Sequence, residues 1–467
     1  MHRVIAAIVL MIGFYVLALG VALGLLAAVY YSVAAGHVYL RLDLAAVIAA
    51  GVIVWSILPR FDHFKAPGPL LAPESQPEVF ELVRGVATET AEEMPHEVYL
   101  VSDVNAFVMN RGGIAGLGSR RVMGVGLPLL QALTASQLRA VVAHEFGHYA
   151  GGDLKLGAWI YKTRAAMART IENLGRTSSW MHKPFLVYGN FYMRVTQKIA
   201  RAQEIAADRM AVRVAGARSH ANALKAVHGA SAAYSAYWLN EVVPVLSNGY
   251  QPPIGAGFAH FLRVEPVVKA MDSAVEQELE SAAADPYDSH PSLKERLAAI
   301  GDFPDVSPLH GDAPATSLLR DLPRLERELF GTGAPELKSV DWQETPTQVF
   351  LPRWRERAEK LASLFAAATV ADVPSLLTGR ELGVALGLAN ATPEERDTEV
   401  RGAVASVLAA KLVDDGWSCT TSPGEQIVFT KNGVTLTPFA DVVRHGENAE
   451  AWLARVREAG VAELRLG

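Results

Sequence analysis

The chain of 467 residues is poor in cysteine and has no excess of basic residues. Its single cysteine, Cys419, cannot form an intrachain disulfide, which is compatible with a reducing compartment. Acidic residues outnumber basic ones, 49 to 43, and no long run of lysine or arginine occurs. Nucleic acid is therefore excluded as a partner, because a protein that binds it presents a strongly basic surface.

Charge is also absent from most of the N-terminal region. Residues 4–35 contain no charged side chain, and about 20 apolar residues are enough to span a bilayer. A second apolar run, 44–58, is long enough to span the bilayer if it is extended back to residue 38. The sequence thus predicts a transmembrane hairpin in residues 1–65, with spans at about 4–33 and 38–58. A cleavable signal peptide is the alternative for the first run, but its apolar region would measure only about 7 to 15 residues.

Basic residues flank this hairpin on one side. Arg3 precedes the first run, and Arg60 and Lys65 follow the second. Because lysine and arginine favour the cytoplasmic side, we expect a multi-pass protein of the inner (plasma) membrane with everything after the hairpin in the cytoplasm.

The soluble part begins after a proline-rich segment at 66–78. Residues 97–102 and 121–126 are typical of short strands, and they flank a glycine-rich stretch at 110–121. That stretch lacks the G-K-[ST] ending of a phosphate-binding loop, and no helix follows it at once. We therefore interpret it as a loop beside a strand.

Residues 141–150 read VVAHEFGHYA and place His144 and His148 four positions apart. Thr134 and Gln137 form a capping-box signature before this stretch, and two glycines follow it, so a helix is predicted. On a helix, the two imidazoles project from one face and can hold one metal ion, with Glu145 beside them. A chance occurrence of this H-E-x-x-H pattern is the alternative.

A catalytic zinc ion needs a third protein ligand. The segment 201–216, RAQEIAADRMAVRVAG, predicts a helix that carries Glu204 and Asp208 four residues apart. Glu204 can bind zinc, while Asp208 can accept the outer N–H of a zinc-binding histidine. The alternative is a solvated acidic pair on a charged helix face.

Four segments, taken together, resemble the HtpX-like zinc metallopeptidases, which share a family with the CAAX prenyl proteases. They are NAFVMNRGG (105–113), VVAHEFGHYAGGD (141–153), EIAADRMA (204–211) and SHPSLKERL (289–297). The resemblance covers about residues 77–300 and implies a zincin-type domain with one zinc ion per chain. It implies that His144, His148 and Glu204 bind zinc and that Glu145 is the catalytic base.

The same resemblance implies that His290 and Arg296 lie near the active site. Either could donate a hydrogen bond to the oxyanion formed during hydrolysis. The structural alternative is that Arg296 pairs with a carboxylate. The strand around 105–110, which includes Asn105, Ala106 and Phe107, or the strand at 121–126 would offer its edge to an extended polypeptide substrate.

The chain departs from the HtpX pattern at residues 154–200. HtpX-type proteins usually have further transmembrane spans there, but nine charged side chains leave no uncharged run of spanning length in this segment. These helices either cover the cleft or lie on the membrane surface. The chamber of the CAAX proteases is absent, which disfavours prenylated substrates. His182, His228 and His260 match no motif, and we interpret them as packing or surface residues.

The peptidase domain is expected at 66–301, and the composition of the sequence changes after it. Residues 302–350 contain a proline-rich stretch typical of a linker, and 351–467 predict a small α+β module. Its helices are expected at 352–368, 392–416 and 449–460, and Asn432-Gly433 predicts a β-hairpin. No ligand cluster or nucleophile motif occurs in this module, so an interaction or regulatory role is the default.

The sequence thus predicts a mainly α-helical α+β protein that acts as a membrane-anchored zinc endopeptidase. From the family resemblance, its function is expected in membrane protein quality control. The alternatives are a processing protease dedicated to one substrate and a non-proteolytic chaperone that is tethered to the membrane on the same fold.

Overall fold

The structure is a computed structural model of the chain. It describes residues 2–58, 64–111, 120–150, 153–177, 181–280, 291–301, 312–331, 337–378, 380–388, 390–446 and 448–467. The predicted fold class is confirmed, because helices dominate the described residues and the sheets are small.

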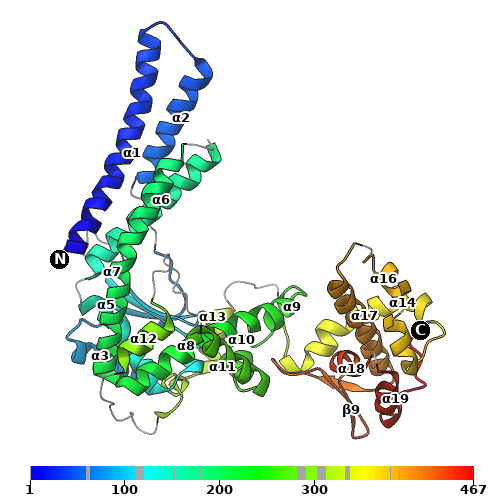
Figure 1. Ribbon diagram of the computed structural model, residues 1–467. Helices are drawn as coiled ribbons and strands as arrows, with labels where there is room; N and C mark the ends of the chain where they lie inside the picture. Colours follow the sequence, from blue (N-terminus) through cyan, green and yellow to red (C-terminus); the bar gives the residue numbers. More distant parts are fainter. Residues whose placement is uncertain are drawn as a thin grey trace. The chain divides into compact units, whose positions relative to one another are not determined.

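Two long helices form the N-terminal hairpin, α1 (His2–Ala34) and α2 (Leu40–Ile57). Both are long and apolar enough to cross a membrane, and their most apolar windows have mean hydropathies of 2.6 and 1.9. Asp43 stabilises the start of α2, because its carboxylate accepts a hydrogen bond from the backbone N–H of Tyr39 at 2.9 Å. Figure 1 shows the two helices side by side, joined at the end far from the N-terminus.

A four-stranded sheet begins the following part of the chain. Its strands are β1 (Leu70–Leu71), β2 (Glu97–Val101), β3 (Ala106–Arg111) and β4 (Arg120–Gly126). They lie in the order β1-β2-β4-β3, and only the β2–β4 pair is parallel. Both predicted strands are confirmed. Among the described strands, β3 pairs with β4 alone and therefore forms an edge of the sheet.

The other described elements of this part of the chain are helical and carry the predicted motifs. They are α3 (Pro77–Thr90), α4 (Leu127–Ala132), α5 (Ala135–Ala150), α6 (Asp153–Thr177), α7 (Lys183–Ala215), α8 (Ala217–Tyr237), α11 (Glu265–Glu280), α12 (Leu293–Ile300) and the 3₁₀ turn η3 (Ala315–Leu318). The predicted capping box of α5 is present, since Thr134 and Gln137 each bond the other's backbone N–H, at 2.9 and 3.3 Å. Gly216, with φ of 89°, ends α7.

The close approach of α5 and α7 depends on small residues. A Cβ atom added at Gly147 would lie 2.8 Å from the Cα of Ala207 and 3.1 Å from the Cβ of Met210. Ala207 is itself fully buried. A glycine between the two histidines of α5 therefore lets the helix that carries Glu204 approach them.

We expect Gly147→Ala to lower the thermal denaturation midpoint of the detergent-solubilised protein. The methyl group meets backbone atoms of α7, and such overpacking costs about 1–3 kcal/mol. The matched control is Gly85→Ala on α3, where nothing lies within 4 Å of the added Cβ. This control should be neutral or stabilising, because alanine favours a helix by about 1 kcal/mol over glycine. Equal midpoints for the two variants would contradict the packing argument.

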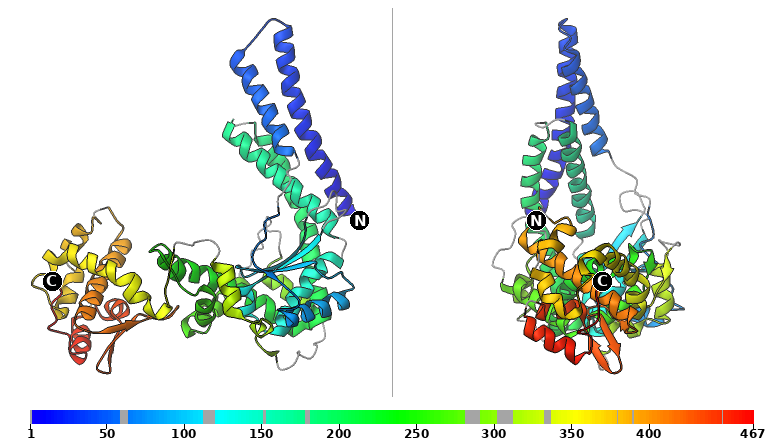
Figure 2. Two further views of the ribbon diagram at one scale, coloured as in Figure 1. Left: turned by 180° about the vertical axis from the view of Figure 1, so that it is seen from behind. Right: turned by 90° about the vertical axis from the view of Figure 1, so that its right-hand side faces the viewer.

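The helices α6 and α7 form a second hairpin, which packs against α1 and α2 (Figures 1 and 2). Their shared apolar cluster includes Phe14 of α1, Ile53 of α2, Leu174 of α6, and Phe185 and Tyr192 of α7. The same helix α7 then continues into the peptidase domain. The N-terminal hairpin is thus connected to the domain through packed side chains as well as through the chain itself.

The described chain divides into two compact units, residues 1–228 with 273–322, and residues 229–272 with 323–467. The second unit contains the end of α8, the start of α11 and the elements that remain. They are η1 (Trp238–Val242), α9 (Val243–Leu246), β5 (Tyr250–Gln251), α10 (Ile254–Phe261), α13 (Leu322–Phe330), β6 (Lys338–Ser339), η4 (Trp342–Glu344), η5 (Pro346–Phe350), α14 (Leu351–Phe365), η6 (Val370–Asp372), α15 (Val373–Thr378), α16 (Arg380–Ala385), α17 (Pro393–Asp414), β7 (Ser418–Thr420), β8 (Val428–Lys431), β9 (Val434–Leu436), α18 (Pro438–His445) and α19 (Ala449–Glu458).

Part of the segment expected to be a linker, 302–350, has regular structure. The indole of Trp342 is buried with Tyr237 and Phe258 in an apolar cluster, and its Nε1–H donates a hydrogen bond to the carbonyl of Pro253 at 3.0 Å. The proline-rich composition suggested an extended segment, but Val340, Trp342 and Val349 supply buried apolar side chains that the composition hides.

The second unit also contains a core formed around α14 and α17. Thr392 and Glu395 form the predicted capping box of α17, with Pro393 in its first turn. Asn432 and Gly433 have φ values of 51° and 81° and connect β8 to β9, as predicted for this dipeptide.

Candidate metal centre and active site

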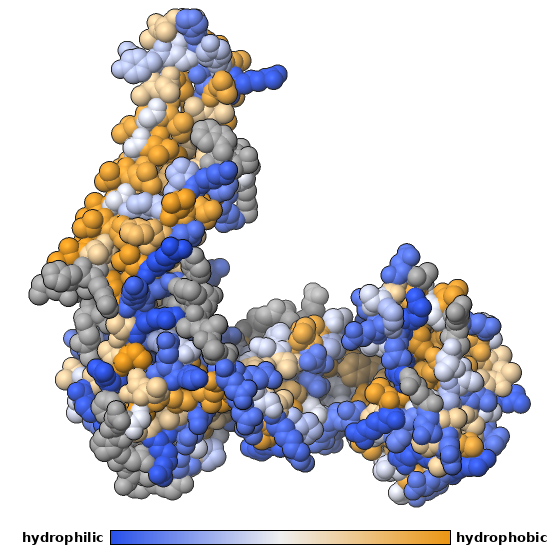
Figure 3. Space-filling model, in the orientation of Figure 1, coloured by the Kyte–Doolittle hydropathy of each residue, from blue (hydrophilic) through white to orange (hydrophobic). Residues whose placement is uncertain are grey.

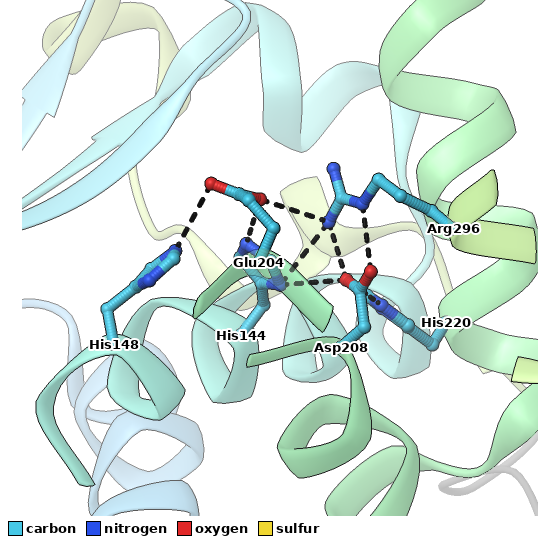
Figure 4. A network of polar contacts seen from close by, with 6 residues as sticks. All are labelled: His144, His148, Glu204, Asp208, His220 and Arg296. Atoms are coloured by element: carbon cyan, nitrogen blue, oxygen red, sulfur yellow. Dashed lines mark hydrogen bonds and ion pairs between the residues drawn. The ribbon is translucent and has the colours of Figure 1, made fainter. Parts of the chain in front are cut away.

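Two neighbouring helices bring the predicted ligands together. His144 and His148 lie one turn apart on α5, and Glu204 faces them from α7 (Figure 4). The Nε2 atom of His144 is 3.5 Å from Oε2 of Glu204, and that of His148 is 3.8 Å from Oε1. His144 and Glu204 are buried, and the side chain of His148 is 26% exposed.

This donor set fits a zinc ion. Two imidazole nitrogens and a carboxylate oxygen lie within 4.8 Å of one another. The two Nε2–O separations are too long for good hydrogen bonds, but ligands at about 2.0–2.1 Å from a tetrahedral ion lie roughly 3.3 Å apart. His144, His148 and Glu204 therefore surround a point that an ion can occupy with small side-chain movements.

A second group of possible donors, His144, Asp208 and His220, has a different character. Oδ1 of Asp208 lies 3.0 Å from Nδ1 of His144 and 2.8 Å from Nε2 of His220, which are hydrogen-bond distances. The guanidinium of Arg296 binds both oxygens of the same carboxylate, at 2.5 and 2.9 Å. Because a cation already occupies this carboxylate, the second group is better described as a hydrogen-bond network than as a metal site.

Asp208 connects this network to the first group. A histidine that binds a metal through Nε2 carries its proton on Nδ1 and donates it to Asp208. Burial opposes ionisation of Asp208, but hydrogen bonds from Arg296 and the two histidines hold its pKa well below the usual range. The carboxylate is thus a fixed negative acceptor behind His144.

The structure pairs Arg296 with Asp208, the structural alternative considered from the sequence. This residue lies on α12, where Ser292 and Glu295 form a capping box. Its Nη2 atom is also 3.8 Å from Oε2 of Glu204. The two hydrogen bonds to Asp208 support the structural role of Arg296 rather than the role of oxyanion donor. His290, the other candidate, lies outside the described residues.

Glu145 lies next to the ligand pair and beneath the edge of the sheet. Burial, reinforced by the negative charge of Glu204, raises the pKa of Glu145 to about 7. The backbone of Val108 on β3 forms a hydrogen bond with this carboxylate. The edge of β3 that does not pair with β4 therefore faces Glu145.

The pKa values of the two histidines of α5 are shifted in opposite directions. Burial lowers the pKa of His144, but the neighbouring carboxylates of Asp208 and Glu204 outweigh this effect and raise the pKa to about 9. Burial and the nearby charge of His144 lower the pKa of His148 to about 4. His148 is therefore a neutral imidazole, the form that binds a metal.

A cavity of about 300 Å³ opens at the ligand group. Asn105 and Ala106 line it, as predicted for substrate-binding residues, but the third candidate does not. The ring of Phe107 packs over Gly124 of β4 and joins an apolar cluster on the sheet.

His220 is a further residue of this site that was not predicted from the sequence. It is 1% exposed, lines the cavity and stacks near His144 with ring centroids 5.9 Å apart. No spacing rule could reveal it, because its position depends on the turn at Gly216 that folds α8 back beside α7. His228, which matched no motif, also lines this cavity.

The part of the chain that carries this site is similar to known proteins. Residues 73–303 match the model of peptidase family M48. These residues belong to that family. The resemblance to HtpX-like metallopeptidases inferred from the four segments is thereby confirmed.

Two curated relatives are similar to part of the chain. The chain is 34% identical over 111 residues to Protease HtpX homolog 1 of Sulfurisphaera tokodaii, covering 23% of the chain and 33% of that protein. It is 30% identical over 113 residues to Protease HtpX homolog of Thermococcus sibiricus, covering 24% and 36%. The chain thus spans about a third of the length of these relatives. No solved structure gives a significant match.

Proposed function

We propose that the chain is a membrane-anchored, zinc-dependent endopeptidase. The observation that carries this proposal is the convergence of His144, His148 and Glu204 next to Glu145, at a cavity under the edge of β3. Zinc bound by the three ligands would polarise the scissile carbonyl and lower the pKa of its water toward neutrality.

Glu145 is the general base of this proposal. Its carboxylate takes a proton from the attacking water and passes it to the leaving amine, a transfer for which a group poised near neutral pH is suited. The free edge of β3 accepts an extended substrate by adding a strand, so that the backbone near Ala106 and Val108 holds the peptide over Glu145. Polypeptides are thus the substrate class.

The proposed activity has a direct test. The purified full chain should hydrolyse casein, lose this activity after chelation and recover it with added zinc. A casein rate that chelation does not change would reject the proposal. No casein hydrolysis by the zinc-loaded protein would instead favour a non-proteolytic, membrane-tethered chaperone on the same fold.

The proposed physiological role is quality control of membrane proteins. The names of the relatives and the two apolar helices support a membrane-associated protease. Comparison of the proteomes of cells with the active enzyme and with Glu145→Gln tests this role. Many stabilised proteins would support it, and a single one would support a dedicated processing protease.

Asp208 and His220 are proposed to position His144 from behind. We expect Asp208→Asn and His220→Leu to lower zinc affinity by about 10- to 100-fold, as the loss of such supporting partners does. His220→Gln, which keeps a donor that can reach Asp208, should retain most of the affinity. Competition with a chelator measures this affinity.

The matched control for these variants is His228→Leu, because His228 lines the same cavity and no described hydrogen bond joins it to Asp208 or His144. Its zinc affinity should equal that of the wild type. Wild-type affinity in His220→Leu would contradict the positioning role.

Topology is the third part of the proposal, with the catalytic domain on the cytoplasmic side of the inner membrane. We expect alkaline phosphatase fused after Lys65 to be inactive and a fusion near Gly36 to be active, since the enzyme needs an oxidising exterior. Arg3, Arg60 and Lys65 motivate this orientation. An active fusion after Lys65 would place the domain on the other side.

A further inference from the structure

The hairpin of α6 and α7 carries features that the proposed peptidase chemistry does not use. Its side chains bond the proposed transmembrane helices: Tyr188 donates to the carbonyl of Leu10 at 2.6 Å, and Arg169 donates to that of Ser56 at 3.2 Å. Asn173 donates to the hydroxyl of Ser56 at 3.1 Å. Polar side chains that turn inward onto backbone carbonyls are typical of helices next to lipid.

These contacts fix how far the hairpin extends along the spans. The helix α2 has 18 residues, or about 27 Å, close to the roughly 30 Å hydrocarbon thickness, so its end near Ser56 marks one face of the bilayer. Beyond Asn173, α6 continues for four residues to Thr177, and α7 begins five residues before Tyr188. The hairpin tip therefore passes this level by about 6–8 Å, at 1.5 Å per residue.

The surface of the tip suits such a depth. Phe185 and Tyr192 face α1, whereas Leu186, Val187 and Phe191 are 41%, 70% and 55% exposed. Figure 3 shows a large apolar surface over α1 and α2. Apart from Glu204, which lies on the far half of α7, the cavity takes none of its described lining residues from α6 or α7.

The charged side chains in the first half of α7 are all basic. Residues 181–200 contain Lys183, Arg194 and Lys198 and no acidic residue, and all three are exposed. Arg194 and Lys198, which follow the apolar patch toward the catalytic domain, match the headgroup region of an anionic leaflet.

We propose that the tip of the α6–α7 hairpin inserts into the headgroup–acyl boundary of an anionic bilayer, on the side of the catalytic domain. The proposal rests on the membrane anchoring proposed above. Amphipathic elements that bind this way enter about 5–10 Å deep, as the tip does here. The structure thereby gives the anchor a second contact with lipid that is not a membrane span.

This contact with lipid fixes the distance between the active site and the bilayer. Thirteen residues of the same helix separate Phe191 from Glu204, which places the ligand about 20 Å further along the axis of α7. An extended chain spans about 3.3–3.6 Å per residue, so a scissile bond must lie at least about six residues from the bilayer. Among membrane-tethered polypeptides, only those with an extended segment next to the span can then reach the site.

Fluorescent labelling tests the depth of the tip. In a Cys419→Ala background, the variants Leu186→Cys and Val187→Cys are labelled with a nitrobenzoxadiazole dye and reconstituted in vesicles that contain phosphatidylglycerol. Lipids with a nitroxide on the acyl chain should quench both labels, and aqueous iodide should not. The matched control, Glu276→Cys on the exposed face of α11, should behave in the opposite way. Iodide quenching at Val187 equal to that at Glu276 would overturn the proposal.

A second arm tests the substrate class. One cleavable sequence is placed two residues or about ten residues from a transmembrane anchor, and both substrates are compared with the soluble peptide. We expect cleavage of the peptide and of the distant sequence only. Equal cleavage of the near sequence would overturn the height argument. Failure to cleave even the soluble peptide would reject the proposed peptidase activity, while the quenching data would still report the depth.

Discussion

Replacement of Glu145 by glutamine is expected to lower kcat by about 10²- to 10⁴-fold, the usual contribution of a general base. Glutamine has the same shape but cannot take the proton of the attacking water. The zinc content should stay at the wild-type level, because Glu145 is not among the three converging ligands. Casein hydrolysis and metal analysis of one preparation measure both quantities.

The control for this variant is Glu276→Gln, which makes the same chemical change on the exposed face of α11. Its rate should match the wild type. If Glu145→Gln cleaves casein as fast as the wild-type protein, the role of Glu145 is wrong, whatever the metal content.

The second large effect is expected for Glu204→Ala, which should lose both zinc and activity. The carboxylate supplies the third ligand, and two histidines on one helix turn cannot complete a catalytic zinc site. Because the side chain of Glu204 is buried beside Arg296, the variant also leaves less negative charge near that cation. Metal analysis after dialysis measures the loss.

Glu204→Gln separates loss of the ligand from loss of packing, because it preserves the side-chain volume while it weakens the ligand. We expect this variant to fold like the wild type, by circular dichroism, and to bind zinc more weakly. Tight, stoichiometric zinc in Glu204→Ala would remove Glu204 from the ligand set.

Much of the site was predictable because its signals are local. The spacing of His144 and His148 and the capping box at Thr134 depend only on the period of one helix, and both appear in the structure. The convergence of Glu204 on them needed one further inference, that small residues let two helices approach. Gly147 and Ala207 carry out this function.

The rest depends on tertiary contacts that no local pattern records. His220 reaches Asp208 only because Gly216 redirects the chain, and Arg296 arrives from a helix 88 residues away. Phe107 was predicted to bind substrate from its motif, but the alternation of a strand turns its ring to the other face. The polar contacts between α6 and α2 were likewise hidden, because the charges in 154–200 gave no sign of which helix they would face.

Crystallography at the zinc absorption edge tests the central claim most directly. Crystals of the full-length Glu145→Gln variant, grown with zinc, should show one strong anomalous peak bounded by Nε2 of His144, Nε2 of His148 and the carboxylate of Glu204. Bond lengths of about 2.0–2.2 Å are expected for these ligands. A peak at Asp208 and His220 instead, or no peak within this cavity, would contradict the account.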